Sequence, residues 1–307
     1  MAERTTRSAI HFAPSEVAYV NIYVYQLLIG ISTGLLYFLN AAGMAIVVSG
    51  MNVINFGQGA FYMFGTLLCY SIWNATGSFV LGLIGSVLVV AVGGGYITER
   101  LLRPLYGRPA LFQLLLTMGV GYIIQDFFVF AWGNRLISHK VPEYLDFRIQ
   151  LMGFKFPFYY IFLIFLSLTI CAVMLFVFKK TKIGMIFRAI ITNRDMVACM
   201  GVNVKMINSV MFMVGVGLSA LAGALNLPLT GTSTTAESSV MFTTMSILII
   251  GGITEIKGAF YGSMLVGLIT TFGAMFLSQY YSMLPAVLMV LVLLVKPEGL
   301  CGKKESV

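Results

Sequence analysis

The chain has 307 residues, of which 59% are hydrophobic and only 10% charged, and its mean hydropathy is +0.94. Soluble globular domains carry about 25% charged residues, so this composition excludes a water-soluble enzyme or binding module. The formal net charge of +8 does not indicate nucleic-acid binding, because most of the 19 basic residues stand in short clusters between long apolar runs.

Residues 17–98 contain no Asp, Glu, Lys or Arg. A transmembrane helix needs about 20 predominantly apolar residues, so this run holds several spans. Later runs without charge occupy residues 109–125, 156–178, 206–236, 238–254 and 258–295. We therefore predict an all-α, polytopic membrane bundle of about 8–10 spans. The transmembrane domain covers residues 17–302, between an N-terminal tail (1–16) and a C-terminal tail (303–307).

Residues 49–59 interrupt the first apolar run with glycines and amide side chains. Backbone that leaves a helix at membrane depth is tolerated where it is buried in protein or lines a cavity, and such breaks mark substrate sites in transporters. An ordinary loop at the membrane surface is the alternative. On the first interpretation, the residues expected to line a substrate path or gate are Asn52, Asn55, Gly57, Gln58 and Gly59.

The basic clusters predict the orientation of the chain. They are separated by even numbers of predicted spans, so all of them can lie on one side, which the positive-inside bias makes the cytoplasm. The C-terminus is then cytoplasmic and the loop of residues 133–155 is outside, whereas the side of the N-terminus is not fixed. The clusters are Arg100/Arg103/Arg108, residues 179–205, Lys257 and Lys296/Lys303/Lys304.

Two further segments carry polar groups near or within the predicted spans. Asp126 is the ionisable residue of a span interior, where an acid suggests a proton relay. The alternative is a structural or interfacial role near the outer end of the span, where Asp126 can reach water or pair with Arg135. Residues 228–237 read as an outer loop or re-entrant turn, whose hydroxyl groups could contact a polar ligand arriving from outside.

Signals of catalysis are missing from the sequence. It contains no G-x-x-x-x-G-K-[ST] phosphate loop, no H-E-x-x-H zinc motif and no G-x-S-x-G nucleophile motif. The two histidines, His11 and His139, have no carboxylate cluster nearby in the sequence. We therefore expect no catalytic residue, no metal site and no cofactor in this chain.

The polar loop of residues 179–205 predicts a short helix, Arg194–Met200. Asn193 is a good N-cap, Asp195 stands in the first turn, where the helix dipole favours an acid, and Gly201 supplies the C-terminal stop. Such a helix can project from the membrane and contact a cytoplasmic motor subunit, or it can be an amphipathic connector that lies on the lipid headgroups.

Five blocks of the sequence, in order, resemble the membrane permease subunits of ABC importers for branched-chain amino acids and the related urea and amide importers. The blocks are Ile54–Gly59 with Tyr62-Met63 (compare I-N-F-A-H-G-E-x-Y-M), Glu99-Arg100 with Arg103-Pro104-Leu105, Gly184/Arg188-Ala189/Asp195/Ala198/Gly201-Val202-Asn203, Gly251-Gly252-Ile253/Gly258-Ala259/Gly262, and Lys296-Pro297-Glu298-Gly299-Leu300. The resemblance implies an ATPase-coupling loop that contains Arg188, Arg194, Asp195, Ala198 and Gly201.

The resemblance further implies a set of partners and a location. These are a second permease subunit, identical or sister, two cytoplasmic ATPase subunits that use ATP, and a periplasmic or lipid-anchored substrate-binding protein, all at a bacterial or archaeal cytoplasmic membrane. The implied function is import of branched-chain or other apolar amino acids by alternating access.

Departures from the family pattern leave the substrate open. Gln58 replaces a histidine, Ala60 replaces an acid, and Thr254, Glu255 and Lys257 replace Gly, Ser and Pro. Urea or a short amide is the alternative substrate. An ATPase-independent secondary carrier or channel is the alternative class, although ion-coupled carriers usually place ionisable groups at the membrane midplane.

Overall fold

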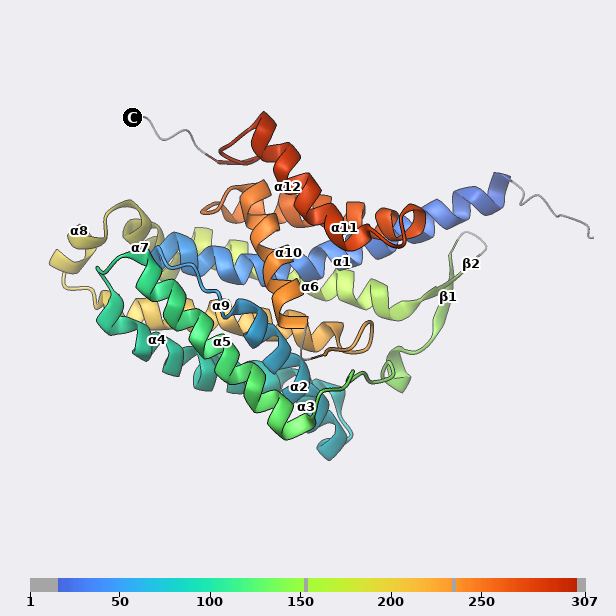
Figure 1. The fold of residues 1–307 in the computed structure, drawn as a ribbon, viewed down its shortest axis with the longest axis horizontal. Helices are drawn as coiled ribbons and strands as arrows, with labels where there is room; N and C mark the ends of the chain where they lie inside the picture. The colour runs from blue at the N-terminus through green and yellow to red at the C-terminus, as the bar shows by residue number, and fades with distance from the viewer. Residues whose placement is uncertain (1–15, 152–153, 234–235, 303–307) are drawn as a thin grey trace, which may run out of the picture.

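The computed structural model describes residues 16–151, 154–233 and 236–302, and most of both predicted tails lies outside these ranges. The described chain is a helical bundle, which confirms the all-α prediction (Figure 1). The helices are α1 (Glu16–Met51), α2 (Gln58–Thr76), α3 (Phe79–Leu88), α4 (Tyr96–Leu102), α5 (Ala110–Trp132), α6 (Phe158–Lys180), α7 (Lys182–Thr192), α8 (Arg194–Cys199), α9 (Val204–Asn226), α10 (Ala236–Gly251), α11 (Ile256–Phe276) and α12 (Leu284–Val295).

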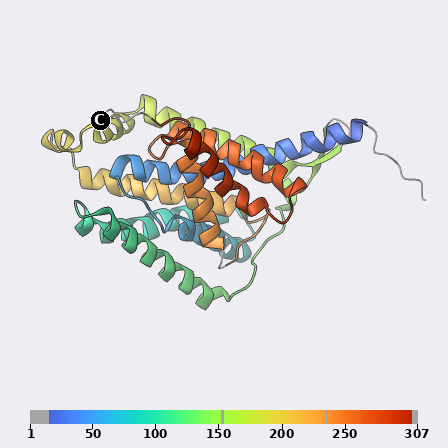
Figure 2. The same ribbon diagram turned by 45° about the horizontal axis from the view of Figure 1, so that its top comes forward.

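Six helical segments of the described chain are long and apolar enough to cross a membrane. They are Ile22–Met51, Phe79–Leu105, Ala110–Trp132, Phe158–Lys180, Val204–Asn226 and Ile256–Phe276. Helices α2, α10 and α12 are shorter or less apolar and pack among them, with α10 steeply inclined to the long helices (Figures 1 and 2).

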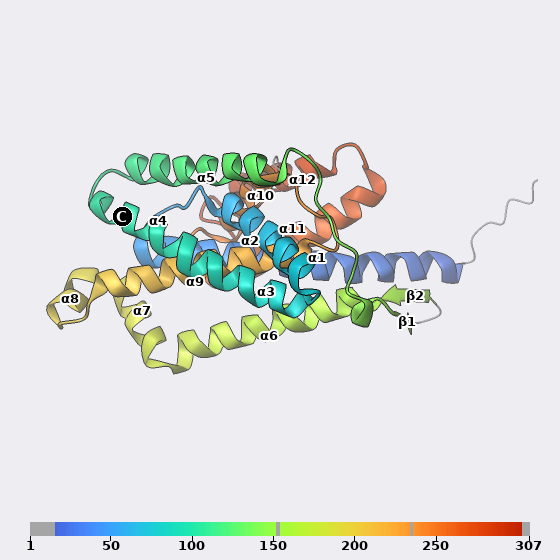
Figure 3. The same ribbon diagram turned by 90° about the horizontal axis from the view of Figure 1, so that it is seen from below.

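Helix α1 is the centre of the bundle. It packs along α9 on one side and along α11 on another. Of the residues in its most apolar stretch, 83% are buried inside the protein. Seen from below, α5 and α6 lie on opposite flanks of the α1, α2 and α9 group (Figure 3). In the most apolar stretch of each flanking helix, only 17% of the residues of α5 and 11% of those of α6 are buried. Their apolar surfaces are therefore available to lipid or to another subunit.

Segment Phe79–Leu105 is one continuous helical rod that changes its winding midway. The π-helical turn η1 (Val89–Gly95) joins α3 to α4, and the 3₁₀ turn η2 (Arg103–Leu105) ends the rod. Three successive glycines, Gly93 to Gly95, form the end of the π turn, and a Cβ at Gly95 would lie 3.1 Å from the Met213 backbone of α9. Gly95 therefore serves close packing of this rod on α9, a usual role of glycine between membrane helices.

The two ends of the bundle differ in character. At one end lie α4, α7, α8, the start of α11 and the end of α12, which carry the predicted basic clusters (Figures 1 and 3). The opposite end holds the start of α1 and the loop after α5. This loop contains the 3₁₀ turn η3 (Glu143–Leu145) and a hairpin of strands β1 (Arg148–Leu151) and β2 (Phe154–Pro157), which the sequence analysis did not predict.

A buried ionic cluster ties α4 to α9 at the basic end. The Glu99 carboxylate is fully buried and accepts hydrogen bonds from Arg103 at 3.0 Å, from the Ser209 hydroxyl at 2.7 Å and from the Tyr106 hydroxyl at 3.1 Å. Burial, together with the Glu99 charge, raises the pKa of Tyr106 well above its ordinary value. Tyr106 therefore stays a neutral donor to Glu99 at physiological pH.

Replacing Arg103 with alanine leaves the Glu99 carboxylate buried without its cation. The Arg103 side chain is 27% exposed, so solvent screens part of the pair. A buried carboxylate that loses its cation is nevertheless destabilising, so Arg103→Ala should lower the stability of the detergent-solubilised protein to heat or denaturant. Arg100→Ala is the matched control, because the exposed Arg100 guanidinium bonds to the Tyr96 hydroxyl, not to a carboxylate. Equal stabilities of the two variants would contradict the assigned role of Arg103.

Candidate functional site

The predicted break between α1 and α2 is present, and local hydrogen bonds shape it. Helix α1 ends where Asn52 adopts a left-handed backbone (φ 54°) and donates its N–H to the Val48 carbonyl at 2.9 Å. Asparagine is one of the few residues that tolerate this conformation at a helix end. The Asn55 Oδ1 then accepts the N–H of Gly57 at 3.1 Å, which forms a turn immediately before α2.

The Gln58 amide joins the start of α2 to two long helices. Its Oε1 accepts from Asn55 Nδ2 at 3.1 Å, and its Nε2 lies 3.4 Å from the Asn40 carbonyl of α1 and 3.3 Å from the Gly215 carbonyl of α9. Asn55 and Gln58 are both 0% exposed. Gly215 stands midway along α9, so this polar junction lies in the middle of the bundle rather than at its surface.

The Asn40 side chain extends the junction to α9 and α10. Its Nδ2 donates to Thr244 Oγ1 at 2.7 Å, and its Oδ1 lies 2.6 Å from the Ser219 hydroxyl. The same hydroxyl lies 2.9 Å from the Gln58 carbonyl oxygen and can donate to either acceptor. Asn40, Ser219 and Thr244, together with Asn55 and Gln58, form what we term the amide network. Sequence analysis missed Asn40, although an asparagine inside an uncharged apolar run was a usable signal.

Glycine is required at two positions of the break by close backbone contacts. A Cβ on Gly59 would lie 2.3 Å from the Glu237 carbonyl oxygen of α10, and one on Gly57 would lie 2.9 Å from the Thr117 carbonyl oxygen of α5. Both are buried, whereas Asn52 is exposed. The five predicted residues thus lie together at one break, with four of them in the packed core. In the segment between α1 and α2, the residue that lines a described cavity is Phe56, which was not among the five predicted residues.

A cavity of about 370 Å³ leads from the hairpin end of the bundle toward the amide network. Asn226, Thr230 and Thr232 line its outer part, and Asn40 and Thr244 lie at its inner part. Tyr37, Tyr62 and Tyr160 contribute further hydroxyl-bearing walls. A mixed polar and apolar cleft of this kind is what small-molecule sites in proteins commonly offer.

A second cavity, of about 230 Å³, lies between α5 and α10 and contains Glu237. Residues 228–237 were predicted to form a loop or re-entrant turn, but α10 begins at Ala236, so Glu237 belongs to its first helical turn. The side chain is 8% exposed. Sequence analysis did not single it out, although it is the one acidic residue between Asp195 and Glu255.

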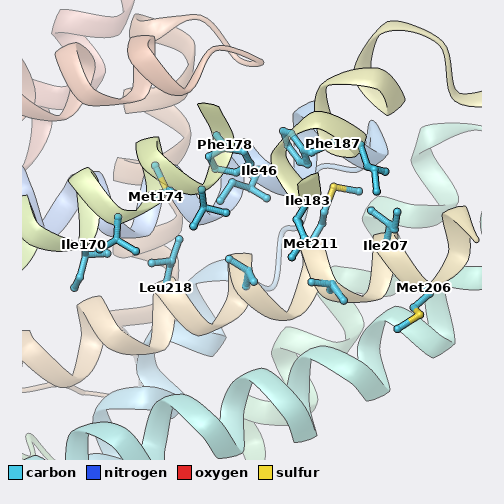
Figure 4. Close-up of a pocket in the computed structure, with 15 residues that line it drawn as sticks. Ile46, Ile170, Met174, Phe178, Ile183, Phe187, Met206, Ile207, Met211 and Leu218 are labelled. Atoms are coloured by element: carbon cyan, nitrogen blue, oxygen red, sulfur yellow. The ribbon is translucent and has the colours of Figure 1, made fainter. Parts of the chain in front are cut away.

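The largest of the described cavities, about 510 Å³, is an unsuitable site for a polar solute. It lies between α6 and α9 beneath α7, and the side chains that point into it are aliphatic, aromatic or methionine, including Ile170, Met174, Phe187, Met211 and Leu218 (Figure 4). A zwitterion or amide placed there would lose its hydration without gaining a hydrogen bond. This cavity is suited to hydrocarbon.

The predicted helix of the basic-end loop is confirmed as α8. Asn193 caps it by accepting the N–H of Met196 at 3.0 Å, and Gly201 has the left-handed backbone (φ 82°) expected of a helix stop. Asp195 and Ala198 are exposed, and the Arg194 guanidinium stands 5.5 Å from the centre of the Tyr106 ring. Helix α8 therefore projects from the bundle and contacts the segment that follows α4.

Helix α7, which precedes α8, was not predicted. Thr181 caps its start by accepting the N–H of Gly184 at 3.2 Å. Its apolar face buries Phe187 and Ile190 against the bundle, while Arg188 donates a hydrogen bond to the Phe178 carbonyl of α6. The predicted coupling residues thus fall on two consecutive helices, with Arg188 on α7 and the others on or beside α8.

Asp126 lies exposed on α5, and no ion pair joins it to Arg135 in the described structure. Of the two interfacial arrangements expected for Asp126, the exposed position fits contact with water rather than the pair with Arg135. An exposed position on a flank of the bundle gives Asp126 no described polar partner through which to relay a proton.

This bundle, with a helix break inside it and a projecting helix at one end, is that of a multi-pass membrane protein. Residues 26–293 match the family described as branched-chain amino acid transport system / permease component. The chain belongs to this family.

Curated relatives cover most of the chain. It is 28% identical to the high-affinity branched-chain amino acid transport system permease protein BraD of Pseudomonas aeruginosa, over 92% of this chain and 97% of the relative. It is 24% identical to the corresponding permease protein LivH of Escherichia coli, over 92% and 96%, and 26% identical to a probable LivH of Methanocaldococcus jannaschii, over 85% and 87%. No solved structure gives a significant match.

The contacts at Gly59 generate a prediction for transport. Gly59→Val must displace the first turn of α10, because the added Cβ meets backbone rather than a movable side chain. We expect substrate uptake, normalised to assembled complex in the membrane, to fall at least about tenfold, because the displaced helix α10 lines both polar cavities. Gly119→Val on α5 is the control, because a Cβ there meets no atom within 4 Å. Equal uptake by both variants would show that the break is only a connector.

Proposed function

We propose that this chain is the transmembrane subunit of an ATP-binding cassette importer that moves branched-chain or other apolar amino acids into the cytoplasm. The observation that carries the proposal is the placement of the helix break. Gln58, at the end of the break, bonds to Asn40 of α1, which lines the cavity reached from the hairpin end. Gln58 also bonds to Gly215 of α9, a helix that runs to the basic end. A small movement of α1, α2, α9 or α10 would thus change both ends together. Alternating access requires coupling of this kind.

The basic end is the proposed cytoplasmic face, and α8 is the proposed contact with the ATPase subunits. Two such subunits would hydrolyse ATP, since this chain carries no phosphate-binding loop motif of its own. The contacts from α8 through Arg194 to Tyr106, and from Tyr106 to the Glu99 cluster on α4 and α9, give a physical route inward. A substrate-binding protein, periplasmic or lipid-anchored, would dock at the hairpin end, above the 370 Å³ cavity.

The flank formed by α5 and α10 is the proposed contact with a second permease subunit, identical or sister. Tyr122 and Phe242 are exposed there, and the Glu237 cavity opens between them. A carboxyl group facing lipid is costly, so acidic side chains in membrane proteins face the protein interior or a water-filled path. A second subunit over this flank would enclose Glu237 in such a path.

Uptake by reconstituted transporter tests the proposal. The permease would be assembled with its ATPase, sister subunit and binding protein in proteoliposomes, and radiolabelled leucine and urea would be supplied outside. Uptake of leucine that requires enclosed ATP, and is much faster than uptake of urea, is the expected result. Preferred uptake of urea would change the substrate to the short-amide alternative. Uptake without ATP would replace the importer by a secondary carrier or channel.

Coupling to the ATPase generates a prediction for α8. Asp195→Lys and Ala198→Arg alter exposed side chains of α8, so both variants should insert and assemble normally. Substrate uptake and substrate-stimulated ATP hydrolysis should fall at least about tenfold, because a like charge or bulk at a packed interface costs more than about 1.4 kcal/mol. Asp195→Glu keeps the charge at the same exposed position of α8 and is the control. Wild-type uptake in both α8 variants would rule out this contact.

The proposed orientation predicts the accessibility of two engineered cysteines. Ser138 lies exposed at the hairpin end and Thr192 lies exposed at the end of α7. The four native cysteines would first be replaced by alanine, because Cys199 is itself exposed. Ser138→Cys should react with an impermeant maleimide in intact cells, with the outer membrane permeabilised where one is present, and Thr192→Cys should react only after the inner membrane is opened. The reverse pattern would invert the proposed topology.

A further inference from the structure

Glu237 has an unusual environment for a carboxyl group. It is 8% exposed, and its Oε2 atom has no hydrogen-bond partner among the described residues. The ion pair in the described part of the chain, Arg103–Glu99, lies elsewhere. A buried carboxyl oxygen without a hydrogen bond is costly. Because Glu237 also lines a cavity, a ligand in that cavity could supply the missing partner.

The cavity beside Glu237 has the composition of a site for an apolar solute with one polar group. Met118, Met241, Phe242 and Met245 supply apolar walls around about 230 Å³ of space, and Phe56 contributes from the break before α2. The Tyr122 and Ser238 hydroxyls are the uncharged polar groups of the lining. Methionine side chains adapt to apolar solutes of different shapes, so the walls suit a family of related aliphatic groups.

Glu237 also stands at the point where α5, α10 and the start of α2 meet. A Cβ added to Gly121 of α5 would lie 2.8 Å from Glu237 Oε1. The same added Cβ would lie 3.5 Å from Gly57 Cα and 3.7 Å from Ala60 Cβ, so these three segments meet at Gly121.

We propose that Glu237 binds the ammonium group of the transported solute, and that the methionine-lined cavity holds its aliphatic side chain. The ligand class is a primary ammonium compound with a compact apolar body, which includes the apolar amino acids. This inference rests on the proposed function, because it assigns a recognition residue for the solute that the proposed importer carries. A carboxylate facing an ammonium group within a partly dry cavity forms a short, charge-assisted hydrogen bond.

Two other roles for Glu237 lead to different measurements. A carboxylate near the first turn of α2 could serve only to complement the dipole of that helix. In that case its replacement would lower stability without changing ligand preference. A proton-carrying role would leave equilibrium binding of the ligand unchanged and alter only the transport rate and its dependence on pH.

Equilibrium binding to the assembled permease–ATPase complex, without the binding protein, tests the inference. Radiolabelled leucine is the probe, and isopentylamine and 4-methylpentanoate are competitors that keep only the amine or only the carboxylate of leucine. In the wild type, isopentylamine should compete and 4-methylpentanoate should not. Glu237→Gln keeps the shape of the side chain but removes its charge, and should weaken leucine binding at least about tenfold, because the charge-assisted hydrogen bond to the ammonium group is lost.

Glu237→Asp and Asp126→Asn complete the set of variants. Glu237→Asp keeps the carboxylate and should retain competition by the amine even if affinity falls, which separates recognition from a folding defect. Asp126→Asn makes the same neutralisation at an exposed site on α5 and should bind as the wild type does.

Three outcomes would overturn the inference. They are unchanged leucine affinity in Glu237→Gln, equal competition by the acid and the amine in the wild type, and an affinity loss in Glu237→Gln with the amine preference retained. The proposed function fails separately, if the complete wild-type transporter shows no ATP-dependent amino-acid uptake.

Discussion

The arrangement of the bundle depends on the amide network that Asn40, Asn55, Gln58, Ser219 and Thr244 form at its centre. Helix α1 cannot continue past Met51 and α2 begins six residues after Asn52, so polar backbone groups are left inside an apolar bundle. Unsatisfied groups at that depth cost several kcal/mol each. Within the break, the Gly57 N–H donates to Asn55 and the Phe56 N–H donates to Thr117 of α5. The network then joins α1, α2, α9 and α10 to one another through side chains distant in sequence.

Fixing these four helices also determines where the cavities lie. Helix α10 separates them, with Thr243 and Thr244 facing the 370 Å³ cavity and Glu237 and Met241 facing the 230 Å³ cavity. The close contact of Gly59 with the α10 backbone holds the start of α2 against the helix that separates the two cavities. The proposed path, the proposed ammonium site and the route to α8 therefore share one set of helices, so that a movement imposed at the basic end reaches both cavities.

The parts of this structure that local sequence determines were predictable. The apolar runs predicted the helical bundle, the amides and glycines of residues 49–59 predicted the break, and the Asn193 and Gly201 signals predicted α8. The parts that depend on distant contacts were not. Asn40 bonds to Thr244, 204 residues away, and the burial of Glu237 depends on α5 and α2. No local pattern reports such pairs, and the short β1–β2 hairpin lacked a strong turn signal.

A double-mutant cycle on Asn40 and Ser219 tests the network most directly. Unfolding of the wild type, Asn40→Ala, Ser219→Ala and the double variant would be compared in the same detergent. Residues that share a buried hydrogen bond show coupling energies of about 0.5–3 kcal/mol, and polar pairs between membrane helices average about 0.6 kcal/mol. We predict a coupling energy above about 0.6 kcal/mol for this 2.6 Å pair. Additive effects of the two substitutions would contradict the account that this network holds the helices around the transport path.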